Sequence, residues 1–232
     1  MRHVKTAVLA TLAALSLAGC DRKKTAPPVA PPPAGAATPA LDAAQAGLLA
    51  AAEPFEALTE MAFTAKPLEL DRSIATAVAT AEHVRPALPS DAQRDLKTQL
   101  DAIAAARRVD DRAGVALASV EIYRLLVSHA AAGPVPMEVN LLDYAGFRYD
   151  ADLKARPSRW DDMAEAAAFG QEKWDAIAAR VTDPGLHDRM AKALSDMAAA
   201  AARKDAALAA DAVKRELDLV DLLEVFFTRP PA

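Results

Sequence analysis

The chain has 232 residues, of which 53% are hydrophobic and 5% aromatic, and its formal net charge is −5. The balance of 27 basic against 32 acidic side chains argues against a nucleic-acid partner, because phosphate binding needs a clustered basic surface. Alanine dominates and glycine occurs only eight times, a composition typical of closely packed helices.

The first residues have the pattern of a secretory signal. Arg2 and Lys5 form a short basic region, and residues 7–18 are an apolar run. That run is too short for a membrane-spanning helix, which needs about 20 residues. It ends in small residues, as signal peptides do. We therefore expect a signal peptide at residues 1–19.

The end of this segment, Leu17-Ala18-Gly19-Cys20, resembles the lipobox of bacterial lipoproteins. In that family the cysteine thiol receives a diacylglycerol, the chain is cut just before it, here between Gly19 and Cys20, and the new amino group is acylated. The resemblance implies a lipid anchor such as palmitate on Cys20, facing the periplasm. An aspartate in the position of Asp21 favours the inner membrane. An ordinary secretory signal with an incidental cysteine is the alternative.

Residues 20–40 are predicted to form a linker behind the lipidated cysteine. Six of the 16 prolines of the chain fall here, among alanines. Such a composition cannot bury a core, and it favours extended polyproline II. We expect a solvated stalk that holds the folded part away from the membrane.

The chain from residue 41 onward predicts an all-α fold of about eight antiparallel helices. An internal repeat organises them, because the 27 residues from Leu100 align without a gap with those from Leu194, at an offset of 94. Residues 57–63 parallel residues 141–147, and residues 74–88 parallel residues 163–177 at an offset of 89. We expect two tandem four-helix up-down bundles from a duplication, at residues 41–133 and 134–232. The predicted helices are residues 43–63, 71–86, 91–108, 111–131, 137–155, 159–181, 185–202 and 205–228.

The alanine-rich hairpins are similar to the last two helices of the cytochrome c-prime family of haem-binding bundles. The chain lacks the Cys-x-x-Cys-His motif of that family, so the resemblance implies a helical bundle without covalent haem. Within residues 159–181, apolar residues alternate spacings of three and four, which predicts a bundle seam. Its two tryptophans fit a bundle core, with a ligand pocket as the alternative.

Four carboxylates fall on faces that are otherwise apolar. Asp143 and Asp150 lie within or beside the apolar face of residues 137–155, and Glu216 and Glu224 lie within that of residues 205–228. Burial of an unpaired carboxylate is costly, so each needs a partner. One interpretation pairs them with arginines or tyrosine hydroxyls. The other gathers them around a metal ion or a cationic ligand.

The same predicted helix contains two tyrosines and a phenylalanine around Gly146. A glycine within a helix costs about 1 kcal/mol relative to alanine, which suggests a close helix contact at this position. The stretch from Leu141 to Leu153 is therefore either a surface for a partner or a close-packed junction between the two bundles.

No motif for nucleophilic catalysis or for a di-iron site occurs, so we expect no enzyme activity and no established metal or cofactor beyond the lipid. The sequence predicts a lipid-anchored, non-enzymatic binding or scaffold protein of the bacterial envelope, with the membrane as one partner and an envelope protein as a candidate second partner. The alternative is a periplasmic protein that binds a metal ion or small ligand through Asp143, Asp150, Glu216 and Glu224.

Overall fold

The computed structural model describes the backbone of residues 39–228 and the side chains of residues 47–228. Over this range the chain forms eight α-helices, so the predicted all-α fold is confirmed. The expected signal peptide, Cys20 and most of the linker lie outside the described residues. The helices are α1 (Pro39–Thr64), α2 (Pro67–Val84), α3 (Ser90–Arg108), α4 (Arg112–His129), α5 (Met137–Lys154), α6 (Trp160–Ile177), α7 (Pro184–Arg203) and α8 (Ala206–Thr228).

Most predicted helix boundaries agree with the structure within a few residues. The start of α2 differs, because the helix begins at Pro67 instead of residue 71. Proline suits the first turn of a helix, where its fixed φ is helical and its missing N–H would have no partner. Pro54 lies inside α1 and does not end it. Short 3-10 turns, Arg85–Ala87 and Ala178–Arg180, extend α2 and α6.

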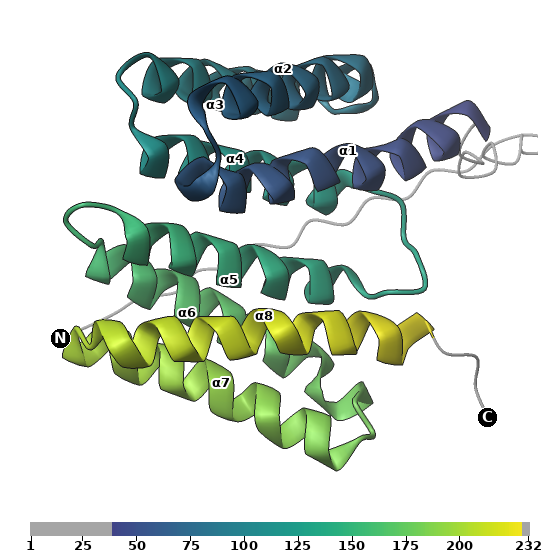
Figure 1. Ribbon diagram of the computed structural model, residues 1–232. Helices are drawn as coiled ribbons and strands as arrows, with labels where there is room; N and C mark the ends of the chain where they lie inside the picture. The colour runs from purple at the N-terminus through teal and green to yellow at the C-terminus, as the bar shows by residue number, and fades with distance from the viewer. Residues whose placement is uncertain (1–38, 229–232) are drawn as a thin grey trace, which may run out of the picture. The chain divides into compact units, whose positions relative to one another are not determined.

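The helices pack in two sets of four. In the first helix set, α1 contacts α2 and α4, and α3 contacts α4. In the second helix set, α5 contacts α6 and α8, and α7 contacts both of these helices. Consecutive helices run in alternating directions, as short connections require (Figure 1). Both sets belong to one compact unit of the chain.

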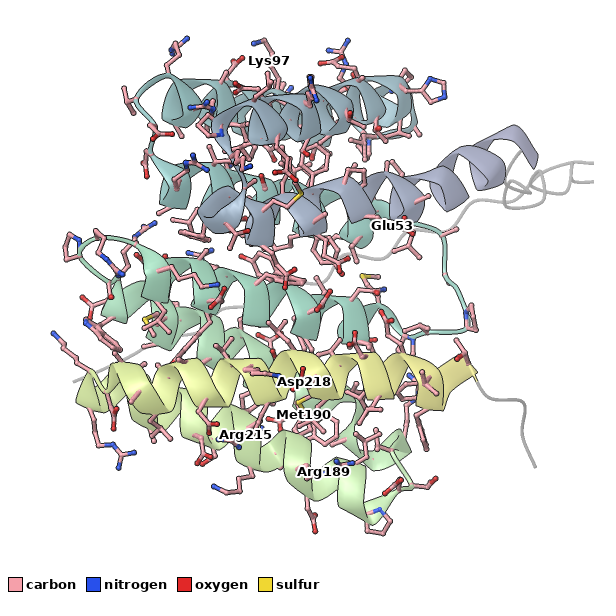
Figure 2. All side chains as sticks on the ribbon, viewed as in Figure 1. Glu53, Lys97, Arg189, Met190, Arg215 and Asp218 are labelled. Atoms are coloured by element: carbon pink, nitrogen blue, oxygen red, sulfur yellow. The ribbon has the colours of Figure 1, made fainter. Side chains whose placement is uncertain are left out.

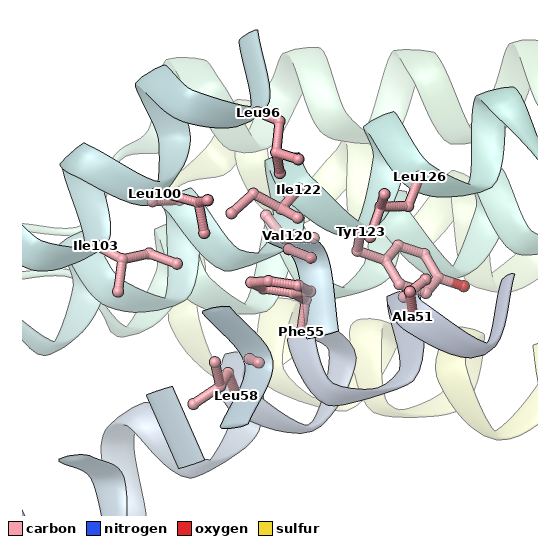
Figure 3. Close-up of a cluster of buried hydrophobic side chains, with 14 of the residues drawn as sticks. Ala51, Phe55, Leu58, Leu96, Leu100, Ile103, Val120, Ile122, Tyr123 and Leu126 are labelled. Atoms are coloured by element: carbon pink, nitrogen blue, oxygen red, sulfur yellow. The ribbon is translucent and has the colours of Figure 1, made fainter. Parts of the chain in front are cut away.

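Each helix set has its own hydrophobic core. In the first core, Phe55 and Leu58 of α1 lie with Leu96 of α3 and Ile122 of α4 (Figure 3). The second core contains the seam predicted on α6, including Trp174, which is buried. The interpretation of this tryptophan as a core residue is therefore confirmed.

Helix α5 is the junction between the two sets. It contacts α4 and α1 of the first set as well as α6 and α8 of its own. Tyr144 and Phe147 belong to the first core, whereas Leu142 and Tyr149 belong to the second. The aromatic stretch around Gly146 is thus the close-packed junction that the sequence suggested, and it buries both sides of the helix.

The turns between α3 and α4 and between α7 and α8 are built in the same way, 94 residues apart. Asp110 and Lys204 both have positive φ, near 54° and 53°. The next residues, Asp111 and Asp205, cap the following helix by accepting a hydrogen bond from the backbone N–H three residues later. These details agree with the predicted offset of 94; the duplication itself stays a prediction.

The earlier helices correspond at other offsets than the sequence suggested. Helix α2 begins at Pro67 and α6 at Trp160, 93 residues later, so the expected offset of 89 is wrong by one helical turn. For α1 and α5 the buried positions correspond at an offset of 91 as well as at the expected 84, because the two offsets differ by two helical turns. The helix ends, Thr64 and Lys154, favour the larger offset of 91. The matched buried pairs are Leu48 with Val139, Ala51 with Leu142, Phe55 with Gly146, Leu58 with Tyr149, and Ala62 with Leu153.

Candidate functional site

A cavity of about 790 Å³ lies between helices α1, α4, α5 and α8. Its walls come from both helix sets. We call it the acidic cavity, because carboxylates dominate its lining and no lysine, arginine or histidine within the described range takes part. The lining carboxylates are Glu53, Glu56, Glu60, Asp143, Asp218, Asp221 and Glu224.

Helix periodicity arranges six of these carboxylates in two rows. Glu53, Glu56 and Glu60 are spaced by three and four residues, so they share one face of α1 and form the α1 row. Figure 2 labels one member of each row, Glu53 on α1 and Asp218 on α8. At a rise of ~1.5 Å per residue, each row extends about 9–10 Å along its helix. The α8 row consists of Asp218, Asp221 and Glu224.

Asp143 is the most deeply buried carboxylate of the cavity lining. The Tyr123 hydroxyl on α4 donates a hydrogen bond of 3.0 Å to its Oδ2. Asp143 is 9% exposed and Tyr123 is 3% exposed. Burial raises the pKa of Asp143 well above its usual range, and the charge of Glu56 raises it further, while the hydrogen bond from Tyr123 opposes these effects.

The rows influence each other across the cavity. Burial raises the pKa of Glu56 from 4.5 to about 7, and the charge of Glu224 on the opposite row contributes. Burial and the charge of Asp221 raise the pKa of Glu224 as well. The acidic cavity is therefore a place where ionised carboxylates repel one another, and a bound cation would relieve this repulsion.

Glu216 of α8 lies beside this site. It is 0% exposed, and neither of its carboxylate oxygens has a hydrogen-bond partner within the described structure. Burial raises the pKa of Glu216 well above its usual range, and the charge of Asp143 adds to the effect. Gly146 makes room for it, because a Cβ at Gly146 would collide with Oε2 of Glu216.

The structure brings together three of the four carboxylates that the sequence singled out. Asp143 and Glu224 line the acidic cavity, and Glu216 is buried close to Asp143. Asp150 is elsewhere and pairs with Lys154, one helical turn away. Asp143 has a tyrosine hydroxyl as its partner, as the structural interpretation allowed, because it accepts the hydrogen bond from Tyr123. Within the described residues, the carboxylate oxygens of Glu216 have neither an arginine nor a tyrosine partner.

Sequence reasoning missed the α1 row, Tyr123, Asp218 and Asp221. The spacing of Glu53, Glu56 and Glu60 by three and four residues was a detectable signal, because it places three like charges on one helix face. Like charges are common on a solvated helix face, so this spacing alone does not indicate a site. The α1 row becomes a candidate site only because the structure places α1 beside α5 and α8.

A second buried carboxylate, Asp152 of α5, shows how this fold treats a charge that serves structure. Asp152 is fully buried between two guanidinium groups, 3.8 Å from Arg148 and 3.4 Å from Arg159. These are ion-pair distances without hydrogen-bond geometry. Burial raises the pKa of Asp152 to about 6, while both arginines oppose the shift. In the acidic cavity Asp218 pairs with Lys214 at 2.7 Å, and the other six lining carboxylates have no ion pair with a basic side chain of the described residues.

The part of the chain that the structure describes holds no group of three or more His, Cys, Asp or Glu side chains arranged to hold one metal ion. Among its helices, none combines the length and the apolar character needed to cross a bilayer. Comparisons with protein-family models, with curated protein sequences and with solved structures found no match to this chain.

Proposed function

We propose that the chain is a lipid-anchored, non-enzymatic binding protein of the bacterial envelope, and that it takes up a cationic ligand in the acidic cavity. The observation that carries this proposal is a cavity of about 790 Å³ lined by seven carboxylates, with no basic side chain from the described residues. Of the two functions that the sequence left open, ligand binding by carboxylates on the bundle faces has the better support.

The charge distribution supports a ligand over a structural role. Three of the lining carboxylates, Glu56, Asp143 and Glu224, lose hydration through burial, which disfavours their charged forms. The other four are exposed and add negative charge at the mouth of the cavity. Where this chain buries Asp152 for structure, it supplies Arg148 and Arg159 as counter-charges. In the acidic cavity only Asp218 has such a counter-charge among the described residues, from Lys214, and a cation from outside would supply one to the remaining carboxylates.

The cellular location is proposed from the lipobox-like ending at Cys20 alone. Two or three acyl chains anchor a protein stably, since each buried methylene contributes ~0.8 kcal/mol. To test this, cells producing the full-length chain are fed a labelled fatty acid, and Cys20→Ser serves as the matched variant. We expect label on the unaltered protein only. A chain that is exported and carries no label would contradict the anchor while leaving the cavity untouched.

Ligand binding is tested on the full-length protein purified from membranes in mild detergent. Mg²⁺, Ca²⁺, Zn²⁺ and organic ammonium compounds are titrated by calorimetry at constant ionic strength. We expect at least one cation to bind with one-to-one stoichiometry. Binding should be lost when Glu56→Gln is combined with Asp143→Asn, and kept in Asp150→Asn, which removes a carboxylate outside the cavity.

Two outcomes would count against this function. The first is that no cation in the series binds at any pH between 6 and 8. The second is that Asp150→Asn weakens binding as much as the cavity variants do, which would indicate a general response to net charge. Circular dichroism of each variant separates loss of binding from loss of the fold.

A further inference from the structure

The acidic cavity is larger than a single bound ion requires. Its volume of about 790 Å³ falls within the ~300–1,000 Å³ that is typical of small-molecule pockets. A Ca²⁺ or Mg²⁺ ion instead needs oxygen ligands gathered within ~2.0–2.6 Å of one point. The carboxylates within residues 47–228 are not gathered in this way. A ligand that fills the cavity must therefore distribute its positive charge over some length.

The two rows indicate how that charge is distributed. The α1 row and the α8 row each extend about 9–10 Å along a helix, with successive carboxylates three or four residues apart. Asp143 lies near both, because the charges of Glu56, Glu224 and Asp221 all raise its pKa. A chain-like ligand with several cationic groups matches this arrangement better than one compact cation does.

Apolar and aromatic side chains lie among the carboxylates. Tyr123, Phe147 and Leu217 contribute to the lining, and Leu49 and Val225 remain 41% and 48% exposed along it. Burial of methylene groups against such a surface is favourable, and aromatic ring faces attract cations. A hydrated metal ion would leave this surface unused, whereas a ligand of alternating methylene segments and ammonium groups would cover it.

Glu216 lies behind the wall of the cavity, against Gly146 of α5, and is not part of the lining. It is fully buried next to Asp143, and its oxygens have no partner among the described residues. At the equivalent position of the first helix set, 94 residues earlier, stands Ile122, a fully buried core residue. Folding alone favours the apolar side chain, because an unpaired buried carboxyl costs free energy. A cation in the cavity would lower the pKa of this carboxyl and so recover part of that cost.

From these features we propose that the ligand is a linear alkyl polyammonium compound. Its ammonium groups contact the α1 row, the α8 row and Asp143, and its methylene segments cover Tyr123, Phe147 and Leu217. This inference rests on the proposed function, since it narrows the ligand of the same cavity from any cation to one chemical class. The size of the cavity favours a small molecule over a basic protein segment.

The experiment compares four probes on the full-length protein: spermidine, putrescine, Mg²⁺ and a tetralysine peptide, each titrated at pH 8 and constant ionic strength. We expect one spermidine per chain, bound more tightly than putrescine and at least about tenfold more tightly than Mg²⁺. Glu56→Gln and Asp143→Asn are each expected to raise the Kd for spermidine by about tenfold, the usual effect of losing one charged hydrogen bond. Asp150→Asn should leave it unchanged.

The outcomes separate this inference from the proposed function. If Mg²⁺ binds more tightly than spermidine and displaces it, the polyammonium inference is wrong and cation binding stands. If tetralysine binds more tightly, the site recognises a protein segment, and the inference again fails. If none of the probes binds, both proposals fail. Should Asp143→Asn not fold, Glu224→Gln at the partly exposed rim tests the same cavity.

Discussion

The carboxylate of Glu216 lies where the side chain of residue 146 would be, and it fits because that residue is glycine. At the equivalent positions of the first helix set stand Phe55 and Ile122, both fully buried. The first helix set thus has an apolar pair where the second has a glycine and a buried acid. This exchange distinguishes the second set from the first, and it is located directly beside the acidic cavity.

Gly146→Ala is expected to destabilise the protein. The new methyl group meets Oε2 of Glu216 and the side chain of Leu217. Overpacking of a core costs ~1–3 kcal/mol, which outweighs the ~1 kcal/mol that alanine gains in helix propensity. Urea denaturation measures the net change. Gly47→Ala is the matched control, because its added Cβ meets nothing within 4 Å, and it should be neutral or stabilising.

Glu216 is expected to make stability depend on pH. Its pKa in the folded state lies well above the 4.5 of an exposed glutamate, so the folded state favours the protonated form. Stability is full below pH 4.5 and is lost as the pH rises towards the folded-state pKa. Glu216→Gln should therefore exceed the unaltered protein in stability by a margin that grows with pH. An equal margin at pH 5 and pH 8, in urea titrations, would show that Glu216 is not protonated.

Ligand affinity is expected to rise between pH 6 and pH 8. The pKa of Glu56 is raised to about 7, so this carboxylate becomes ionised over that range and can then pair with an ammonium group. Binding below pH 7 should release protons, which calorimetry detects as an enthalpy that varies with the ionisation enthalpy of the buffer. Glu56→Gln should bind more weakly and flatten the profile. If Glu56→Gln leaves the pH dependence of the affinity unaltered, Glu56 does not contribute to ligand binding.

The buried Asp152 and the half-buried Glu56 are expected to respond in opposite directions to neutralisation. Asp152→Asn leaves Arg148 and Arg159 without their shared partner, and we expect a loss of ~1–3 kcal/mol in the free energy of unfolding. Glu56→Gln removes a charge that its neighbours repel, so it should stabilise the protein at pH 8. A gain in stability joined to a loss of binding is typical of a functional residue. Thermal unfolding of both variants at pH 8 makes the comparison.

Periodicity was sufficient to predict the helices and the faces that they bury. The seam of α6 and the apolar faces of α5 and α8 follow from spacings of three and four, and all of them lie in the cores. The register between repeats was harder to predict, because alanine-rich helices align almost equally well after a shift of one turn. The offset of 89 for α2 and α6 failed for this reason.

The sequence predicted only those site residues that lie on otherwise apolar helix faces. Asp143, Glu216 and Glu224 interrupt apolar stripes, so they could be identified from a helical wheel. Asp150 stands at the edge of such a stripe, where the wheel does not decide between burial and an ion pair with Lys154. The α1 row lies on a polar face, so a helical wheel does not distinguish it from an ordinary solvated surface. Only the packing of α1 beside α5 and α8 makes it one wall of the cavity.

The sharing of α5 between two cores bears on how the molecule melts. Tyr144 and Phe147 pack in the first core, and Leu142 and Tyr149 pack in the second. Unfolding of either core therefore removes contacts that hold α5 in place for the other. A chain split at the loop before α5 would leave the first half without part of its interior. The two helix sets should therefore unfold as a single cooperative unit, and calorimetry should record one transition with equal van't Hoff and calorimetric enthalpies.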